Sequence, residues 1–353
     1  MKPKHPKRER GIALLMTLAF IALAISLAVE TNRSARLALE SSDAVRSRLI
    51  AGQMATAGVH GAMALLIQDR YASETDHPKE TWSDPEKRNE ALLALAFEDG
   101  RLAVLITDET ARIQINALVD FPPSRQFNPQ QQQIMERAID LVRRDLGLEG
   151  DLMPADMVNA IKDWLDTGDD EAITGLNGAE SDYYQGLDPP YQIRNGPMLH
   201  IGELARVKGI SATLFEGRED RAGLRDLMTV HGMAPSADGR YTFTGKINLN
   251  TASRTVLAAL MPPEYSDLAE ALVAYREEAD AAVLEGQAWY QDVPGAGGLE
   301  LNADLITLAT HLFRIQATAE WNGFQRTVTA VVERLMATDG RGWTCRILAW
   351  EMS

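Results

Sequence analysis

The sequence predicts an α+β protein in which a long N-terminal helix packs on an antiparallel sheet and a large all-α domain is inserted between the strands. Three observations support this fold class. An apolar run near the amino end continues into an amphipathic helical pattern. Segments rich in β-branched and aromatic residues close the chain, and segments with helical spacing lie between the two. Helices and strands that occur in separate blocks are typical of α+β folds.

The amino end carries a membrane-spanning segment. Residues 12–29 are uncharged and strongly apolar, and a helix of this length is long enough to cross a hydrocarbon core. Residues 1–11 hold five Lys or Arg residues against Glu9, whereas the net charge of the whole chain is −15. Because basic residues favour the cytoplasmic side, we expect one span, with everything from Glu30 onward on the far side of the membrane.

The predicted helix continues beyond the apolar run. Apolar residues recur at helical spacing from Val29 to Ile67, and no proline lies between Val29 and Asp69. We therefore expect a transmembrane half over residues 12–29 and a water-exposed half over residues 30–70. A secretory signal would instead carry a small-residue cleavage site after the apolar run. An ordinary signal anchor preceded by a chance glycine is the alternative interpretation of this segment.

A loop and two strands are predicted over residues 71–120. The stretch 71–89 contains two prolines and many charges, so we expect a loop there. Residues 101–106 alternate between apolar and polar side chains, and residues 108–118 read as a turn followed by a second strand. A β-hairpin is the simplest structure for these two segments.

The middle of the chain is predicted to be helical. Three of its segments show helical spacing, namely residues 130–146, 153–167 and 201–207. We expect an inserted α-helical domain over residues 121–244 and a second helical part over residues 245–310. The run 245–252 echoes the run 111–117, but the likeness is too short to indicate a repeat.

The last segment, residues 311–353, is predicted to form three antiparallel strands. The strands are expected at residues 311–321, 326–335 and 343–350. Asn322-Gly323 and Asp339-Gly340 between them are typical turn dipeptides. We expect the apolar faces of these strands to pack against the water-exposed half of the long helix.

The amino end resembles the type IV pilin and pseudopilin family. A short basic leader, residues 1–11, ends in Gly11, and the apolar helix begins at once with Ile12. The resemblance implies that a prepilin peptidase cleaves between Gly11 and Ile12 and that the new amino terminus of Ile12 is methylated. It also implies an inner-membrane protein with a cytoplasmic N-terminus and a periplasmic body.

The fifth residue after this cleavage site departs from the family pattern. Most members carry a glutamate there, whereas this chain has Met16. In a packed filament that glutamate pairs with the terminal ammonium of a neighbour, because an unpaired charge in an apolar core is costly. A subunit without the glutamate fits best as the first subunit, at the filament tip. The chain resembles in this respect the K-type minor pseudopilins of type II secretion systems.

The resemblance to the K-type subunits extends through the body of the chain. The motifs that carry it are Asp163-Trp-Leu-Asp166, Gly178-Ala-Glu180-Ser-Asp182-Tyr-Tyr184, Pro189-Pro-Tyr191, Ile201-Gly-Glu-Leu204, Ile247-Asn-Leu-Asn-Thr-Ala252 and Phe313-Arg-Ile-Gln-Ala317. The resemblance implies a tip subunit that nucleates the pseudopilus for protein export across the outer membrane. Its implied partners are the I-type and J-type minor pseudopilins and the major pseudopilin.

An acidic segment in the predicted insertion is a candidate calcium site. Calcium takes six to eight oxygen ligands and tolerates irregular loops, although the spacing here is not that of an EF-hand. The family resemblance implies structural calcium in this domain. The candidate ligands are Asp166, Asp169, Asp170, Glu180 and Asp182. A solvated acidic loop without a metal is the alternative.

Three other classes of function fit the sequence less well. Residues 247–276 resemble a helix-hairpin-helix module, which suggests a membrane-anchored DNA receptor, but residues 261–265 place two prolines and a glutamate where phosphate-binding amides are needed. The acidic body also disfavours nucleic acid. A minor pilin of a type IV pilus is a further alternative. We expect no enzyme, because the sequence has no phosphate loop and no nucleophile elbow, and its one cysteine, Cys345, excludes an intrachain disulfide.

Overall fold

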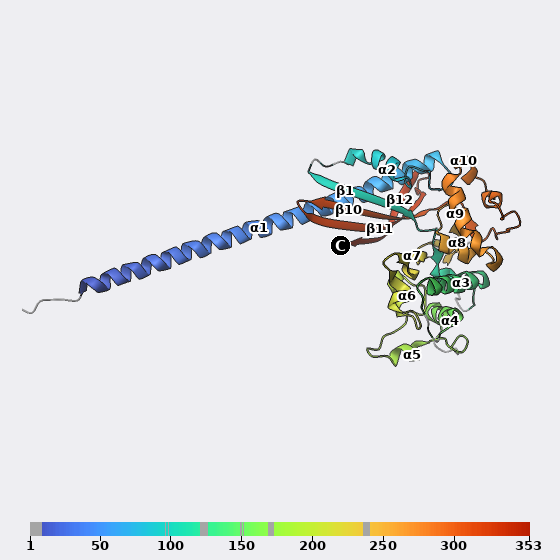
Figure 1. Ribbon diagram of the computed structural model, residues 1–353, viewed down its shortest axis with the longest axis horizontal. Coiled ribbons are helices and arrows are strands. Elements are labelled where there is room, and N and C mark those ends of the chain that lie inside the picture. The colour runs from blue at the N-terminus through green and yellow to red at the C-terminus, as the bar shows by residue number, and fades with distance from the viewer. Residues whose placement is uncertain are drawn as a thin grey trace, which may run out of the picture.

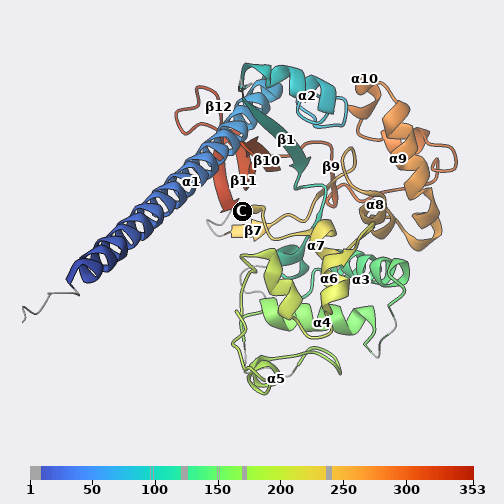
Figure 2. The same ribbon diagram turned by 60° about the vertical axis from the view of Figure 1, so that its left-hand side comes forward.

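A computed structural model of the chain describes residues 9–95, 97, 99–120, 126–148, 150, 152–168, 173–235 and 241–353. The described residues form two units (Figure 1). One is a four-stranded sheet that packs against the C-terminal half of helix α1 (Glu9–Ala72). The other is a helical insertion that lies beyond the end of α1 farthest from the amino terminus (Figure 1). The N-terminal half of α1 projects away from both units (Figure 2).

The sheet is antiparallel throughout. It consists of β1 (Gly100–Asp108), β10 (Leu312–Trp321), β11 (Phe324–Met336) and β12 (Trp343–Met352), in that spatial order. Asn322 and Gly323 connect β10 to β11 with positive φ angles of 48° and 77°, the conformation that an Asn-Gly hairpin turn requires. The predicted α+β class and the three C-terminal strands are therefore confirmed.

The second half of α1 buries one stripe against the sheet. The buried residues of the stripe recur every three or four positions and are Ala51, Met54, Ala55, Val59, Ala62, Leu65 and Leu66. Gly58 lies at the closest approach, because a Cβ atom there would come within 2.9 Å of the Leu102 side chain and 3.1 Å of Ala317. Trp82 and Phe313 complete this core with an edge-to-face contact, their ring centroids 5.2 Å apart.

The segment predicted as a loop contains a short helix. Helix α2 (Pro85–Ala91) begins after Asp84, whose carboxylate accepts the N–H groups of Glu86 and Lys87 at 2.9 and 3.2 Å. The 3₁₀ helix η1 (Leu93–Leu95) follows it. An N-cap aspartate followed by a proline is a helix start signal, so the charges of this segment belong partly to a capped helix.

The predicted β-hairpin is wrong. Strand β1 pairs with β10, more than 200 residues later, instead of with the segment that follows it. In that segment Ile113 and Ile115 are both fully buried, and strand β2 (Ile113–Gln114) pairs in parallel with β5 (Met228–Thr229). The side chains of residues 113–115 therefore enter the core of the insertion, and they cannot also line one face of a hairpin.

The insertion has its own hydrophobic core, whose buried residues run from Ala111 to Leu299. Its helices are α3 (Pro129–Asp145), α4 (Pro154–Leu165), α5 (Ser181–Gln185), α6 (Ala212–Glu216), α7 (Leu224–Leu227), α8 (Arg254–Leu260), α9 (Ala269–Glu278), α10 (Ala281–Leu284) and the 3₁₀ helices η2 (Ile115–Leu118), η3 (Ile201–Arg206), η4 (Pro263–Leu268) and η5 (Trp289–Asp292). Its other strands are β3 (Gly217–Arg218), β4 (Arg221–Ala222), β6 (Met233–Pro235), β7 (Tyr241–Phe243), β8 (Ile247–Asn248) and β9 (Ile306–Thr307). Two of the predicted helices are α3 and α4, whereas the third, over residues 201–207, is the 3₁₀ helix η3.

The two runs that echo each other in the sequence have the same local structure. Strand β8 pairs in parallel with β9, as β2 does with β5. Gln114 accepts the N–H of Asn116 at 3.1 Å, and Asn248 accepts the N–H of Asn250 at the same distance. Each run therefore uses an amide side chain to fix the turn that follows a short buried strand.

A buried arginine joins the sheet to the end of α1. Arg334 on β11 donates to both carboxylate oxygens of Asp76 at 2.6 and 2.8 Å and to Asp69 at 3.1 Å. It also donates to the carbonyls of Leu66 and Thr310. Burial raises the pKa of both Asp69 and Asp76 to about 7, and the Arg334 guanidinium opposes this shift. The two carboxylates thus depend on Arg334 for compensation.

Replacing this arginine tests its contribution to stability. We expect Arg334→Met to lower the free energy of unfolding by about 3–5 kcal/mol, because two buried carboxylates lose their cationic partner. Urea denaturation of the full-length protein in detergent micelles measures the change. The matched control is Arg346→Met, since the exposed Arg346 pairs with Glu333 on the surface of the same sheet and should cost about 1 kcal/mol or less. Equal losses in the two variants would contradict the assignment.

Candidate functional site

Residues 12–29 of α1 form an apolar rod that no other described part of the chain covers. Among the described residues, α1 is the helix long and apolar enough to cross a membrane, and its most apolar stretch has a mean hydropathy of 2.7 with none of it buried in the protein. The hydroxyl of Thr17 donates to the carbonyl of Leu14 at 2.9 Å, so this polar group is satisfied within the helix. The rod is therefore suited to contact lipid or other apolar helices on every side.

The predicted cleavage site lies at the start of this rod. Gly11 and Ile12 are consecutive exposed residues of α1. Apart from the chain neighbours and the adjacent helix backbone, no atom of the described residues lies within 4 Å of where a Cβ atom at Gly11 would be. Met16 is on the same face as Ile12, four residues along, and is 60% exposed. Residues 1–8 of the predicted leader lie outside the described residues.

A second candidate site lies at the C-terminal end of α4. Asp163, Asp166 and Glu180 are all buried, and each places one carboxylate oxygen within 4.8 Å of the other two. Asp163 accepts the backbone N–H groups of Thr174 at 3.1 and 3.2 Å and of Ala179 at 2.7 Å. These bonds bring Glu180 back to α4. We call Asp163, Asp166 and Glu180 the insertion site.

One lysine partly neutralises the insertion site. The ammonium of Lys162 donates to Asp166 at 2.7 Å and to the hydroxyl of Thr174 at 3.0 Å. Burial raises the pKa of Asp166, and the hydrogen bond from Lys162 opposes that shift. Among the described residues, Oδ1 of Asp166 is buried with no hydrogen-bond partner. Three buried carboxylates whose oxygens lie this close together are ligands that could hold a calcium ion.

The structure brings together some of the predicted calcium ligands. Asp166 and Glu180 belong to the insertion site, whereas Asp182 is exposed on α5 and is not one of the grouped residues. Asp169 and Asp170 lie outside the described residues. Sequence reasoning did not include Asp163 among the ligands, although its spacing of three residues from Asp166 places both carboxylates on one face of a helix.

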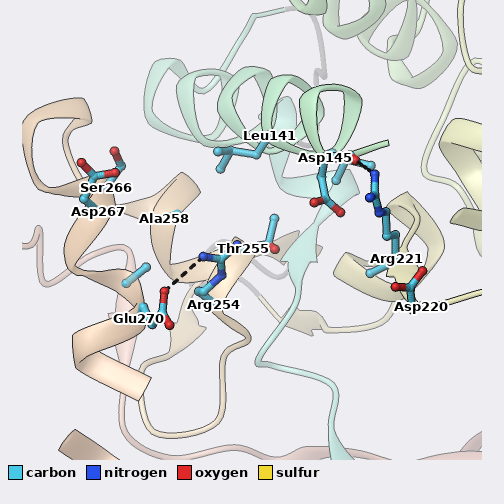
Figure 3. Close-up of a pocket in the computed structure, with 13 residues that line it drawn as sticks. Leu141, Asp145, Asp220, Arg221, Arg254, Thr255, Ala258, Ser266, Asp267 and Glu270 are labelled. Atoms are coloured by element: carbon cyan, nitrogen blue, oxygen red, sulfur yellow. Dashed lines mark hydrogen bonds and ion pairs between the residues drawn. The ribbon is translucent and has the colours of Figure 1, made fainter. Parts of the chain in front are cut away.

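A separate hollow of about 650 Å³ lies between α3, α8, α9 and β4 (Figure 3). Its charged side chains have both signs and are exposed, and Arg254 and Glu270 lie 3.5 Å apart across it. Asp145 and Arg221 line the opposite side (Figure 3). Exposed charges of mixed sign are typical of a hydrated surface, so we assign no chemistry to this hollow.

Comparison with known proteins decides the family. A family model described as Type II secretion system (T2SS), protein K matches residues 111–218. Type II secretion system protein K of Klebsiella pneumoniae is 31% identical over 263 residues, covering 73% of this chain and 72% of that protein. The chain belongs to the protein K family of type II secretion systems. The protein K of Aeromonas hydrophila is 30% identical over 217 residues, which is 59% of this chain and 61% of the relative.

A solved structure supports the fold. The structure described as the GspK-GspI-GspJ complex of the enterotoxigenic Escherichia coli Type 2 Secretion System contains a chain that aligns with a TM-score of 0.56 at 15% sequence identity. The alignment covers 89% of this chain and 99% of that one. This chain therefore has the same overall fold as the aligned chain of that complex.

The family assignment settles the main prediction from sequence. The resemblance to K-type subunits is confirmed, and with it the role of a minor pseudopilin in type II secretion. The match at residues 111–218 also contains the insertion site. Membership of the protein K family favours this role over a DNA receptor or a pilin of another filament.

Proposed function

We propose that this minor pseudopilin occupies the tip of the pseudopilus and nucleates its assembly. One observation carries the proposal: the helical insertion lies beyond the end of α1 opposite the apolar rod (Figure 1). In a filament whose subunits align their α1 helices along the axis, the insertion extends past the pilin-like unit. A second subunit stacked above would meet this bulk.

Met16 supports the same position. The side chain is apolar, exposed and on the same helix face as Ile12. A subunit with no neighbour above it has no terminal ammonium to pair with, so a carboxylate at residue 16 would be uncompensated in the apolar filament core. Met16 and the insertion thus favour the same end of the filament.

The remaining parts of the proposal concern processing, location and partners. The basic leader before an apolar helix supports an inner-membrane anchor with the body in the periplasm. We propose cleavage by a prepilin peptidase between Gly11 and Ile12. Because the structural neighbour is described as a GspK-GspI-GspJ complex, we propose the I-type and J-type minor pseudopilins as partners, with the major pseudopilin below them.

We further propose that the insertion site holds structural calcium. Asp163 is fixed by two backbone amides, and Asp166 has an oxygen without a hydrogen-bond partner among the described residues. A calcium ion would add positive charge beside these carboxylates and hold Glu180 close to α4. That the protein has no enzymatic activity stays a prediction.

Intact mass tests the processing step. We expect protein from membranes of cells with the prepilin peptidase to lack residues 1–11 and to carry one added methyl group on Ile12. Protein from cells without the peptidase should be uncut. A product that begins after the apolar run would contradict the pseudopilin topology.

Substitution of Met16 tests the tip position. We expect Met16→Glu to lower the number of assembled pseudopili several-fold, because its carboxylate would enter the filament core without a partner. The control Met16→Leu keeps an apolar side chain of similar size and should assemble normally. Pseudopili are counted by electron microscopy of cells that overproduce the major subunit. Full assembly with Met16→Glu would indicate a position with a neighbour above.

Calcium titration tests the insertion site. We expect the mature full-length protein in micelles to bind calcium, and a concentration one hundred times the Kd to stabilise the folded state by about 2.7 kcal/mol. Asp166→Asn should remove this binding event because it removes a ligand charge. The matched control is Asp182→Asn, which changes an exposed carboxylate outside the insertion site. Equal calcium binding by these two variants in a calorimeter would contradict the assignment.

A further inference from the structure

The junction between α1 and the sheet contains a second group of buried carboxylates. Asp69, Asp76 and Glu80 each place one oxygen within 4.8 Å of the other two. None of the three residues is more than 9% exposed. They come from the end of α1 and from the loop that follows it, well outside the insertion. We call these three residues the junction site.

At the junction site, the positive charge in contact with the carboxylates is smaller than their combined negative charge. Arg334 contacts Asp69 and Asp76, so one guanidinium faces three carboxylates. Arg70 also lowers the pKa of Asp69, but its guanidinium donates to the carbonyl of Ser73 and lies over the Trp343 ring. If all three carboxylates are ionised, their negative charge exceeds that of the one guanidinium in contact with them among the described residues, which is a costly arrangement.

The side chain of His77 donates no hydrogen bond to Glu80 among the described residues. Its Nδ1 atom accepts the backbone N–H of Lys79 at 3.2 Å. The other ring nitrogen, Nε2, lies 3.8 Å from Oε1 of Glu80, beyond hydrogen-bond distance. The carboxylate of Asp108 also lies close enough to raise the pKa of Asp76, which adds to the negative potential.

One oxygen of Glu80 has no partner. Its Oε2 accepts the indole N–H of Trp82 at 2.7 Å and the backbone N–H of His77 at 3.0 Å. Its Oε1 is buried and, within the part of the chain that the structure describes, has no hydrogen-bond partner. Since buried carboxylate oxygens are almost always satisfied, this atom points to a missing ligand.

We propose that the junction site binds a divalent cation that prefers oxygen ligands, Ca²⁺ in particular. The ligands are carboxylates on an irregular loop, which suits the flexible coordination of calcium. The ion would add two positive charges to the one that Arg334 supplies. It would also give Oε1 of Glu80 a partner. This site is independent of the insertion site.

The ion would join the two units of the molecule. Asp69 belongs to α1, and Asp76 is bound to Arg334 on β11. The backbone carbonyl of Asp76 accepts the side-chain N–H of Asn248, which belongs to the insertion. A cation at the junction site would therefore fix the position of the insertion relative to α1.

Terbium, a luminescent substitute for calcium, distinguishes this site from the insertion site. The mature full-length protein carrying Asp166→Asn is studied in micelles after chelation, so that the insertion site is disabled. We expect one calcium-binding event to persist and bound terbium to emit on tryptophan excitation, because the Trp82 indole is bonded to Glu80. Adding Glu80→Gln should weaken calcium binding at least tenfold and abolish the emission. The matched control Glu86→Gln, an exposed glutamate on α2, should change neither.

Two results would overturn the proposal: no calcium binding by the Asp166→Asn protein, or binding that Glu80→Gln leaves unchanged. The first result indicates that protons neutralise the carboxylates instead.

If Glu80→Gln does not fold, the variant Trp82→Phe tests the proposal in its place. It keeps the three ligands and removes the tryptophan that sensitises terbium emission. Unchanged calcium binding with lost emission then supports the junction site, whereas persistent emission overturns it. If the insertion site binds no calcium, wild type and Asp166→Asn bind equally, and the junction site is judged on Glu80→Gln alone.

Discussion

The buried guanidinium of Arg334 lies where the segments that define this molecule meet. It bonds to Asp69 at the end of α1, to Asp76 in the following loop and to the carbonyl of Thr310 just before β10. The same loop accepts a hydrogen bond from Asn248 of the insertion. Because these groups are inaccessible to water, each loses a hydrogen-bond or charge partner that water does not replace if Arg334 is removed. Together with the apolar stripe of α1, this side chain therefore helps to fix the orientation of α1 relative to both units.

The attachment to the sheet gives the two halves of α1 different surroundings. From residue 51 onward the helix buries a stripe against the sheet, and before residue 44 every described side chain is exposed. Rigid attachment of the second half to the sheet makes the first half a fixed arm, and residues 12–29 of this arm are apolar on all sides. Such an arm can leave the bilayer only by packing among similar helices. In the tip position that we propose, the insertion at its far end is the part of the assembly most distant from the membrane.

Much of the fold could be predicted from local sequence, and the parts that could not depend on distant segments. The helix follows from unbroken periodicity, and the last strands follow from β-branched residues around Asn322-Gly323. The hairpin prediction failed because the partner of β1 is encoded more than 200 residues later, and local alternation carries no information on pairing. The insertion site was predicted in part. Asp166 and Glu180 were named from composition, whereas Asp163 acquires its role only when Thr174 and Ala179 close the loop onto it.

The most direct test of the tip position is to locate this subunit in an assembled filament. A gold-labelled epitope inserted between Pro235, the last residue of β6, and Tyr241, the first residue of β7, would be imaged on pseudopili by electron microscopy. The account predicts one label on each filament, always at the end distal to the membrane. Labels spaced along the filament would contradict it, because the insertion would then fit between stacked subunits.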